Sequence, residues 1–204
     1  MLTVGHSNHE ADAFLQLLVR HGVDEVVDVR SAPYSRYASQ FNHDALRSAL
    51  EDVGIGYTYL GGELGGRPAD RSSYDADGRV RYNRVADSDD FDDGIRRVIR
   101  AADEGQVALV CTEKEPLECH RTLLVARNLV ERGVAVGHIL ADGGLEAHDA
   151  TMLRLVEVHK LPPDGDMFRT RDDVIAEALE RQVRKFAYVG ERPPPAGDDW
   201  HGAL

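Results

Sequence analysis

The stretch that decides the fold is QVALVCTEKEPLECHRTLLVARNLVERGVAVGHIL, residues 106–140. It opens with the apolar run Val107–Val110, and a polar loop then begins at Cys111. From about Cys119 onward, apolar and polar residues alternate with a period near 3.6, which predicts a helix. A second apolar run over 134–140 predicts another strand. Continuous apolar runs are typical of parallel strands covered on both faces, so the stretch predicts a β-loop-α-β unit.

The rest of the chain repeats this alternation of apolar runs and amphipathic segments. An α/β fold follows: a three-layer sandwich of about five mostly parallel strands with helices on both faces. Strands are predicted over 2–5, 24–29, 55–60, 107–110 and 134–140, and helices over 10–21, 43–52, 91–104, from about 119, over 145–158 and over 172–186.

We expect one α/β domain over residues 1–160, followed by a C-terminal helix and a loose tail over 161–204. Residues 69–90 are polar, turn-rich and loaded with Arg, which indicates a lid or an insertion because long loops in compact domains are commonly functional. The tail contains the run Pro193-Pro-Pro and the single Trp200.

The composition limits the function classes. The formal net charge is -12, and only three of the 24 basic residues are Lys. A broadly acidic surface repels nucleic-acid phosphates, so we expect no extended duplex-binding face, although a small Arg-lined cleft could still take a nucleic acid as substrate. No recognised nucleic-acid motif is present. The expected partner is a small anionic ligand.

Two further classes are disfavoured. No apolar run approaches the roughly 20 residues that cross a bilayer, and the N-terminus LTVGHS has no basic leader, so we expect a cytoplasmic protein without a membrane partner. Two cysteines in such a chain do not make a disulfide framework. The glycine-rich loop over 61–66 has neither Rossmann nor P-loop spacing.

Reactive side chains follow three of the predicted strands. In parallel sheets ligands bind beyond the carboxyl ends of the strands, so these side chains are expected at one edge. The candidate catalytic residues are Glu113, His120, Cys111, Cys119 and His6, and the candidate ligand-binding residues are Ser7, Asp28, Arg30, Ser31, Pro33, Ser35 and Arg121.

Asp28 interrupts an otherwise apolar strand, where a carboxylate is costly unless it is paired. Arg30, two residues further on, projects to the same side of a strand and could approach it. Either Asp28 caps its own loop, or it orients a catalytic His or Arg.

The order of these motifs resembles one family. Thr3-Val-Gly-His-Ser-Asn8, Asp28-Val-Arg-Ser-Ala-Pro33-Tyr-Ser35, Tyr57 with Leu64-Gly-Gly66, Cys111-Thr-Glu113 and Cys119-His-Arg121 together resemble the DUF488 family over roughly residues 2–140. The resemblance implies a compact α/β domain of unsettled biochemistry, with the candidate residues at the family's motif positions. A weaker resemblance is to the rhodanese and cysteine-phosphatase plan, in which a strand-end Cys opens an anion-cradling loop. The loop after Cys111 departs from that plan because it is longer and acidic.

Several mechanisms remain open at this point. In the first, Arg30, Arg121 and a helix N-terminus hold an anionic, nucleotide-like ligand while Glu113 with His120 or His6 exchanges protons. In the second, Cys111 or Cys119 is a nucleophile that carries a persulfide or an acyl group.

A non-enzymatic binding module, or cysteines and polar groups that only hold the loops, would also fit. The two cysteines, His120 and His6 or Glu113 are ligand types that suit zinc, but no CxxC or HxxxH spacing supports a metal site, so none is assigned. The sequence names no cofactor and no oligomeric state.

Overall fold

The structure, a computed structural model, describes residues 1–190 and contains a six-stranded sheet with the order β3-β2-β4-β1-β5-β6. Every neighbouring pair is parallel except β5 and β6. The tail with Pro193 and Trp200 lies outside the described residues. The strands are β1 (Leu2–Gly5), β2 (Glu25–Asp28), β3 (Gly56–Tyr59), β4 (Val107–Cys111), β5 (Gly137–Ile139) and β6 (Leu145–Ala147).

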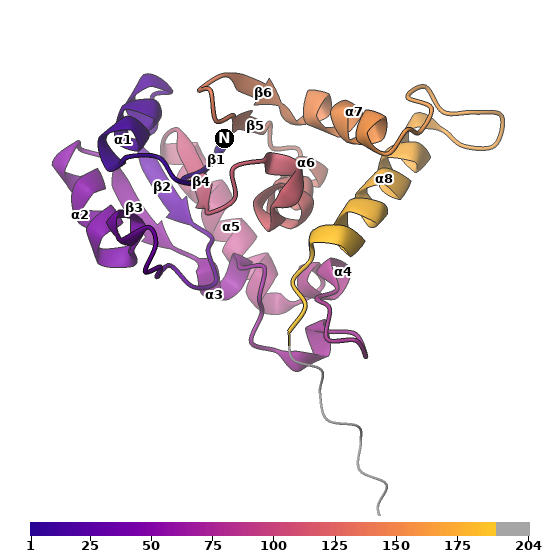
Figure 1. The fold of residues 1–204 in the computed structure, drawn as a ribbon, viewed down its shortest axis with the longest axis horizontal. Coiled ribbons are helices and arrows are strands. Elements are labelled where there is room, and N and C mark those ends of the chain that lie inside the picture. The colour runs from indigo at the N-terminus through magenta and orange to yellow at the C-terminus, as the bar shows by residue number, and fades with distance from the viewer. Residues whose placement is uncertain (191–204) are drawn as a thin grey trace, which may run out of the picture.

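Helices cover both faces of the sheet, which confirms the predicted α/β architecture (Figure 1). They are α1 (Ala11–Arg20), α2 (His43–Asp52), α3 (Gly61–Leu64), α4 (Tyr82–Ala86), α5 (Asp89–Glu104), α6 (Arg127–Glu131), α7 (His148–Val158) and α8 (Arg171–Phe186). None of the helices in the described part of the chain is both long and apolar enough to cross a bilayer.

Two hydrophobic cores lie on opposite faces of the sheet. Helices α1 and α2 bury residues such as Phe14 and Leu46 against one face, together with Val26 and Val110 of the strands. Helices α5 to α8 pack against the other face, which receives Val27 and Leu109. Side chains alternate along a strand, so odd and even positions of β2 and β4 enter different cores. Full burial of each such aliphatic or aromatic side chain contributes about 1.5–3 kcal/mol.

Local sequence explains where the long helices begin. The Ser88 side chain accepts a hydrogen bond from the backbone N–H of Phe91, and three Asp residues occupy the first turn of α5. At the start of α8, Thr170 and Asp173 form a reciprocal capping box. Both helices therefore start close to the predicted residues.

One element differs from the sequence prediction. The helix expected over 145–158 is a short strand, β6, followed by α7 from His148. Gly143 takes a positive φ of 82° in the turn after β5, which reverses the chain and lets β6 pair antiparallel with β5. The reversal adds a sixth strand at the sheet edge.

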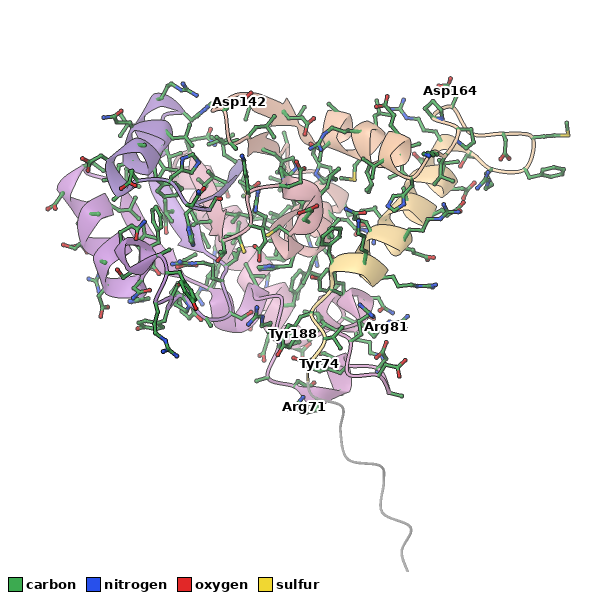
Figure 2. The ribbon with its side chains drawn as sticks, in the orientation of Figure 1. Arg71, Tyr74, Arg81, Asp142, Asp164 and Tyr188 are labelled. Atoms are coloured by element: carbon green, nitrogen blue, oxygen red, sulfur yellow. The ribbon has the colours of Figure 1, made fainter. Side chains whose placement is uncertain are left out.

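Residues 69–90 are ordered against the rest of the molecule. Val80, Tyr82 and Val85 are buried in the same core as α5 and α8. The chain after α8 returns to this segment: the N–H of Val80 donates to the carbonyl oxygen of Tyr188 at 2.9 Å. Figure 2 shows Tyr188 close to Tyr74 and Arg71, at the corner of the molecule below α4. The C-terminal segment and residues 69–90 thus together form one wall beside the carboxyl ends of the strands.

Candidate functional site

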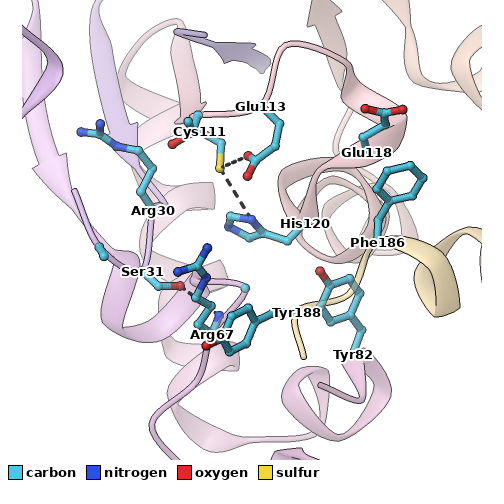
Figure 3. A pocket seen from close by; sticks show the side chains of 13 residues that line it. Arg30, Ser31, Arg67, Tyr82, Cys111, Glu113, Glu118, His120, Phe186 and Tyr188 are labelled. Carbon is cyan, nitrogen blue, oxygen red and sulfur yellow. Dashed lines mark hydrogen bonds between the residues drawn. The ribbon is translucent and has the colours of Figure 1, made fainter. Parts of the chain in front are cut away.

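A cavity of about 170 Å³ lies beyond the carboxyl ends of β2 and β4 (Figure 3). Four parts of the chain line it: Arg30, Ser31 and Ala32 after β2; Gly66, Arg67 and Tyr82; Cys111, Thr112, Glu113, Glu118 and His120; and Phe186 and Tyr188. The edge of the sheet at which the sequence predicts the reactive side chains therefore contains a cavity.

Four of the candidate catalytic residues meet at this cavity. The ligand atoms of Cys111, Glu113, Cys119 and His120 all lie within 4.8 Å of one another; we call these residues the Cys-Glu-His cluster. The Sγ atoms of Cys111 and Cys119 both donate to Oε2 of Glu113, at 2.9 and 3.0 Å. The same two sulfur atoms lie 3.6 and 3.9 Å from Nδ1 of His120. Cys111, Glu113 and His120 line the cavity, and Cys119 lies behind them.

The loop between β4 and the following helix brings Cys119 back beside Cys111. Glu115 accepts a hydrogen bond from the N–H of Leu117 and caps a 3-10 turn over Pro116–Glu118. After Cys119 the chain enters a buried π-helical segment, Arg121–Ala126. Such wide turns are rare and concentrate at functional sites.

Arg121 is fully buried and ties this loop together. Its Nη1 atom donates to the carbonyl oxygen of Glu113 at 2.6 Å, and its backbone N–H donates to Sγ of Cys119 at 3.4 Å. Within residues 1–190 its Nε atom has no hydrogen-bond partner. Gly5 allows the close approach, because a Cβ there would lie 1.8 Å from the Glu113 carbonyl oxygen. Arg121 thus sets the shape of the cluster from behind and does not line the cavity.

Burial and mutual contact shift the pKa values of the cluster in different directions. Burial raises the pKa of the Cys111 thiol well above its usual value, and it also raises the pKa of Glu113. Burial acts in the same sense on Cys119, but the hydrogen bond with Cys111, the Arg121 guanidinium and His120 outweigh it and hold the Cys119 pKa low. For His120, burial is outweighed by Cys119 and Glu113, so its pKa is raised. The thiol with the lowered pKa, that of Cys119, is therefore the one that does not line the cavity.

A second polar group, Asp28, Arg30 and His6, lies at the same edge but largely on the other face of the sheet. Asp28 is fully buried, and its carboxylate accepts hydrogen bonds from Nε and Nη2 of Arg30, at 2.8 and 2.5 Å, and from the Tyr57 hydroxyl at 2.8 Å. It also accepts from the backbone N–H of Arg30 at 3.0 Å, so Asp28 both caps its own loop and holds the Arg30 guanidinium, while a catalytic role for Arg30 stays a prediction.

His6 belongs to this second group. It stacks on Phe41 with 4.4 Å between ring centroids, and its Nε2 accepts from Nη1 of Arg30 at 3.1 Å. Burial, followed by the Arg30 charge, lowers the pKa of His6 to about 4. His6 does not line the cavity, and Figure 3 shows the Arg30 guanidinium turned away from Cys111.

The other predicted ligand-binding residues mostly shape loops. The N–H of Ser35 donates to Oδ1 of Asn42, and the carbonyl oxygen of Pro33 accepts from the N–H of His43. Ser7 takes a positive φ of 46° and donates its backbone N–H to the carbonyl oxygen of Thr112. Of these residues only Ser31 lines the cavity, where its Oγ accepts from the backbone N–H of Arg67 at 2.9 Å.

Several lining residues were not singled out in the sequence. Arg67 follows the Gly65-Gly66 pair, and its guanidinium lies 4.5 Å from the ring centroid of Tyr188. A Cβ on Gly66 would lie 2.8 Å from Cγ of His120, so the glycine lets the ring reach the cluster. The Gly-Gly-Arg run was the available signal for Arg67, but Tyr82, Phe186 and Tyr188 carry no local signal because only tertiary packing brings them here.

No curated protein matches the chain. Two crystal structures of a DUF442 protein from Shewanella putrefaciens CN-32, described as a candidate phosphatase, are similar to it. They share 12% and 13% sequence identity with it at TM-scores of 0.35 and 0.38, and each alignment covers 92% of this chain and 89% or 87% of the other. The family model "Domain of unknown function DUF488" matches residues 10–128, so the chain belongs to the DUF488 family.

Proposed function

We propose that this protein is an enzyme that acts on a small anionic ligand in the 170 Å³ cavity, with the Cys-Glu-His cluster as its reaction centre. Glu113 and His120 exchange protons with the ligand, and Arg67 holds its negative charge. The observation that carries the proposal is that Cys111, Glu113 and His120, with Cys119 directly behind them, line the same cavity as the guanidinium-bearing Arg67.

Arg67 is available for an anion, unlike the two Arg residues expected from the sequence. Arg30 is engaged by Asp28, and Arg121 donates to the carbonyl oxygens of Glu113 and Lys114. No Asp or Glu among residues 1–190 forms an ion pair with Arg67, which is exposed and lines the cavity beside Tyr188. A guanidinium in this setting can donate two parallel hydrogen bonds to a phosphate or a carboxylate.

The size of the cavity limits the ligand. Pockets that enclose drug-sized molecules have volumes of about 300–1,000 Å³, whereas this one measures about 170 Å³. A phosphate group with a few attached atoms fits inside. The base of a nucleotide would extend beyond the mouth, so the phosphate-bearing end is the part of such a ligand that the site recognises.

Binding of inorganic phosphate and of nucleoside monophosphates, measured by calorimetry, tests the anion site. We expect Arg67→Gln to weaken binding by about 10–100-fold, the value of a hydrogen bond to a charged group. Arg71→Gln is the matched control, because Arg71 also stacks on a tyrosine, Tyr74, but lies outside the cavity lining. Equal affinities of the two variants, or no anion binding by the wild type, would refute the proposal.

Turnover tests the reaction centre. In a screen of phosphoesters, nucleotides and nucleosides, Glu113→Gln should lose activity while keeping anion binding, because Arg67 is untouched. If Glu113→Gln keeps full activity, Glu113 does not exchange the proton.

A cysteine-dependent sulfur transfer is the second candidate, because Sγ of Cys111 itself lines the cavity. In that reaction the Cys111 thiolate attacks the outer sulfur of thiosulfate, a persulfide forms, and sulfite leaves with the electron pair of the broken S–S bond. Intact mass after incubation with thiosulfate would show one added sulfur atom, absent in Cys111→Ser. An unchanged mass excludes this candidate.

A further inference from the structure

We propose that the Cys-Glu-His cluster binds one zinc ion through Sγ of Cys111, Sγ of Cys119, Nδ1 of His120 and Oε2 of Glu113. The spacing of the ligand-type residues in the sequence did not by itself support a metal site here. The ion binds whether or not the cavity also takes an anion.

Four of the six distances between the ligand atoms lie near the values that a tetrahedral zinc ion requires. Zn–S bonds of about 2.3 Å and Zn–N or Zn–O bonds of about 2.0–2.2 Å imply ligand–ligand separations of roughly 3.5–3.8 Å. The two sulfur atoms lie 3.6 and 3.9 Å from Nδ1 of His120 and 2.9 and 3.0 Å from Oε2 of Glu113. The remaining two pairs lie within 4.8 Å, so movements of up to about 1 Å, including an outward movement of the carboxylate, complete the tetrahedron.

The imidazole is oriented as a ligand. Nε2 of His120 lies 2.9 Å from the carbonyl oxygen of Val29, which can only accept a hydrogen bond. The neutral ring therefore keeps its proton on Nε2 and turns the Nδ1 lone pair toward the two sulfur atoms. Histidines that bind metals almost always donate their other ring N–H in this way.

The charges around the cluster balance when zinc is bound. Two thiolates and one carboxylate carry three negative charges, and Zn²⁺ with the buried Arg121 guanidinium supplies three positive charges. Buried charges are tolerated only when they are compensated, so the neutral sum removes the main cost of burying this set. Two thiolates with an imidazole select zinc over magnesium or calcium, which prefer oxygen ligands.

The position of Glu113 gives the ion access to the cavity. Cys119 lies behind the cavity wall, whereas Glu113 lines it. With zinc held by Cys111, Cys119 and His120, Glu113 would be the ligand that an oxygen atom of a bound substrate could replace, and its carboxylate would then be free to accept a proton. Catalytic zinc sites likewise keep three protein ligands and one exchangeable position.

The test is the metal content of the full-length protein, purified under reducing conditions from zinc-supplemented cells and measured by elemental analysis and native mass spectrometry. We expect one zinc per chain. Cobalt substitution should give the visible absorption of a tetrahedral thiolate complex, and this spectrum is independent of any enzymatic activity. Cys111→Ser and Cys119→Ser should each weaken zinc binding by more than the roughly 10–100-fold that loss of an outer hydrogen-bond partner costs.

Glu118→Gln is the matched control, because Glu118 lines the same cavity and adjoins Cys119 but lies outside the cluster. It should bind zinc like the wild type. Circular dichroism identifies any cysteine variant that fails to fold. In that case Glu113→Gln, which keeps the shape of the side chain, takes its place in the zinc-binding measurement. A folded wild-type protein that contains no zinc and takes up none from solution would overturn the site, as would cysteine variants that bind zinc normally. Arg67→Gln separates the two proposals, because it should lose anion binding and keep its zinc.

Discussion

The Nε2 atom of His120 donates to the carbonyl oxygen of Val29 at 2.9 Å, across 91 residues of sequence. This bond joins the end of β2 to the start of the π-helical segment and holds the imidazole between the two cysteines and the cavity. The geometry of the proposed reaction centre therefore depends on backbone placement as much as on the side chains of the Cys-Glu-His cluster.

Gly66 makes room for that imidazole, so Gly66→Ala should disturb the reaction centre. The added Cβ would lie 2.8 Å from Cγ and 3.1 Å from Nδ1 of His120, and the ring cannot withdraw without losing its bond to Val29. We expect zinc affinity to fall by roughly 10–100-fold, as when an outer partner of a metal ligand is lost. Gly62→Ala is the control, because nothing lies within 4 Å of a Cβ there. Zinc titration compares the two variants. Similar zinc affinities would contradict the role assigned to Gly66.

Replacement of Asp28 should cost far more stability than replacement of an exposed carboxylate. Asp28→Asn leaves the Arg30 guanidinium, only 6% exposed, without a counter-ion, and breaking a buried pair costs about 3–5 kcal/mol. The comparison is Glu51→Gln, whose pair with Arg47 is 57–59% exposed and therefore contributes little to stability. Urea unfolding measures both. Equal losses would show that the Asp28–Arg30 pair is not a structural anchor.

The buried pair His138 and His148 should make the fold sensitive to mild acid. Burial, followed by the positive charges of His148 and Arg121, lowers the pKa of His138 to about 3, and burial also lowers the pKa of His148. Glu146 acts in the opposite sense on His138, and Arg154 acts in the same sense as Arg121.

The unfolded chain, with a histidine pKa near 6.5, therefore binds protons before the folded chain does, and stability falls as the pH drops below about 6.5. At pH 5.5 proton binding by His138 in the unfolded chain should by itself lower the free energy of unfolding by about 1.4 kcal/mol. Urea midpoints at pH 7.5 and 5.5 measure this loss in the wild type, and His138→Gln should show a loss smaller by about 1 kcal/mol. His6 contributes in the same direction to both proteins. A stability that is flat or rises toward pH 5.5 would be inconsistent with neutral buried histidines.

Tyr188 should position Arg67 through its ring and not its hydroxyl. The guanidinium carbon lies 4.5 Å from the ring centroid, and such a contact contributes about 0.5–1 kcal/mol at exposed sites. Tyr188→Ala should raise the dissociation constant for phosphate by about 2–5-fold, whereas Tyr188→Phe keeps the wild-type value. Calorimetric titration with phosphate compares them. If the Phe and Ala variants weaken binding equally, the stack does not hold Arg67.

The sheet could be predicted from the sequence because its signal is local. The apolar runs at 2–5, 107–110 and 134–140 and the period of the intervening helices depend only on neighbouring residues, and the structure has strands and helices there. The same patterns placed Cys111, Glu113, Cys119 and His120 at the carboxyl edge. The sixth strand was missed because three residues, Leu145–Ala147, are too few to distinguish a strand from the first turn of a helix.

The faces of the sheet were decided by tertiary structure. His6, Asp28 and Arg30 reach the predicted edge, and Arg30 also lines the cavity, but His6 stacks on Phe41 and the Arg30 guanidinium donates to the Phe41 carbonyl oxygen, on the face of the sheet that α1 and α2 cover. The sequence grouped both sets because it shows which strands end in reactive residues and not which face each residue joins.

The identity and sequence order of the reactive residues were therefore determined by the sequence alone: two cysteines, a glutamate and a histidine between the end of one strand and the start of the next helical segment. Their convergence within 4.8 Å, the lining of the cavity by Phe186 and Tyr188, and the position of the Arg67 guanidinium over the Tyr188 ring were decided only by the tertiary structure. The reason is physical, since each of these features depends on contacts between segments that lie far apart along the chain, and no local preference encodes such contacts.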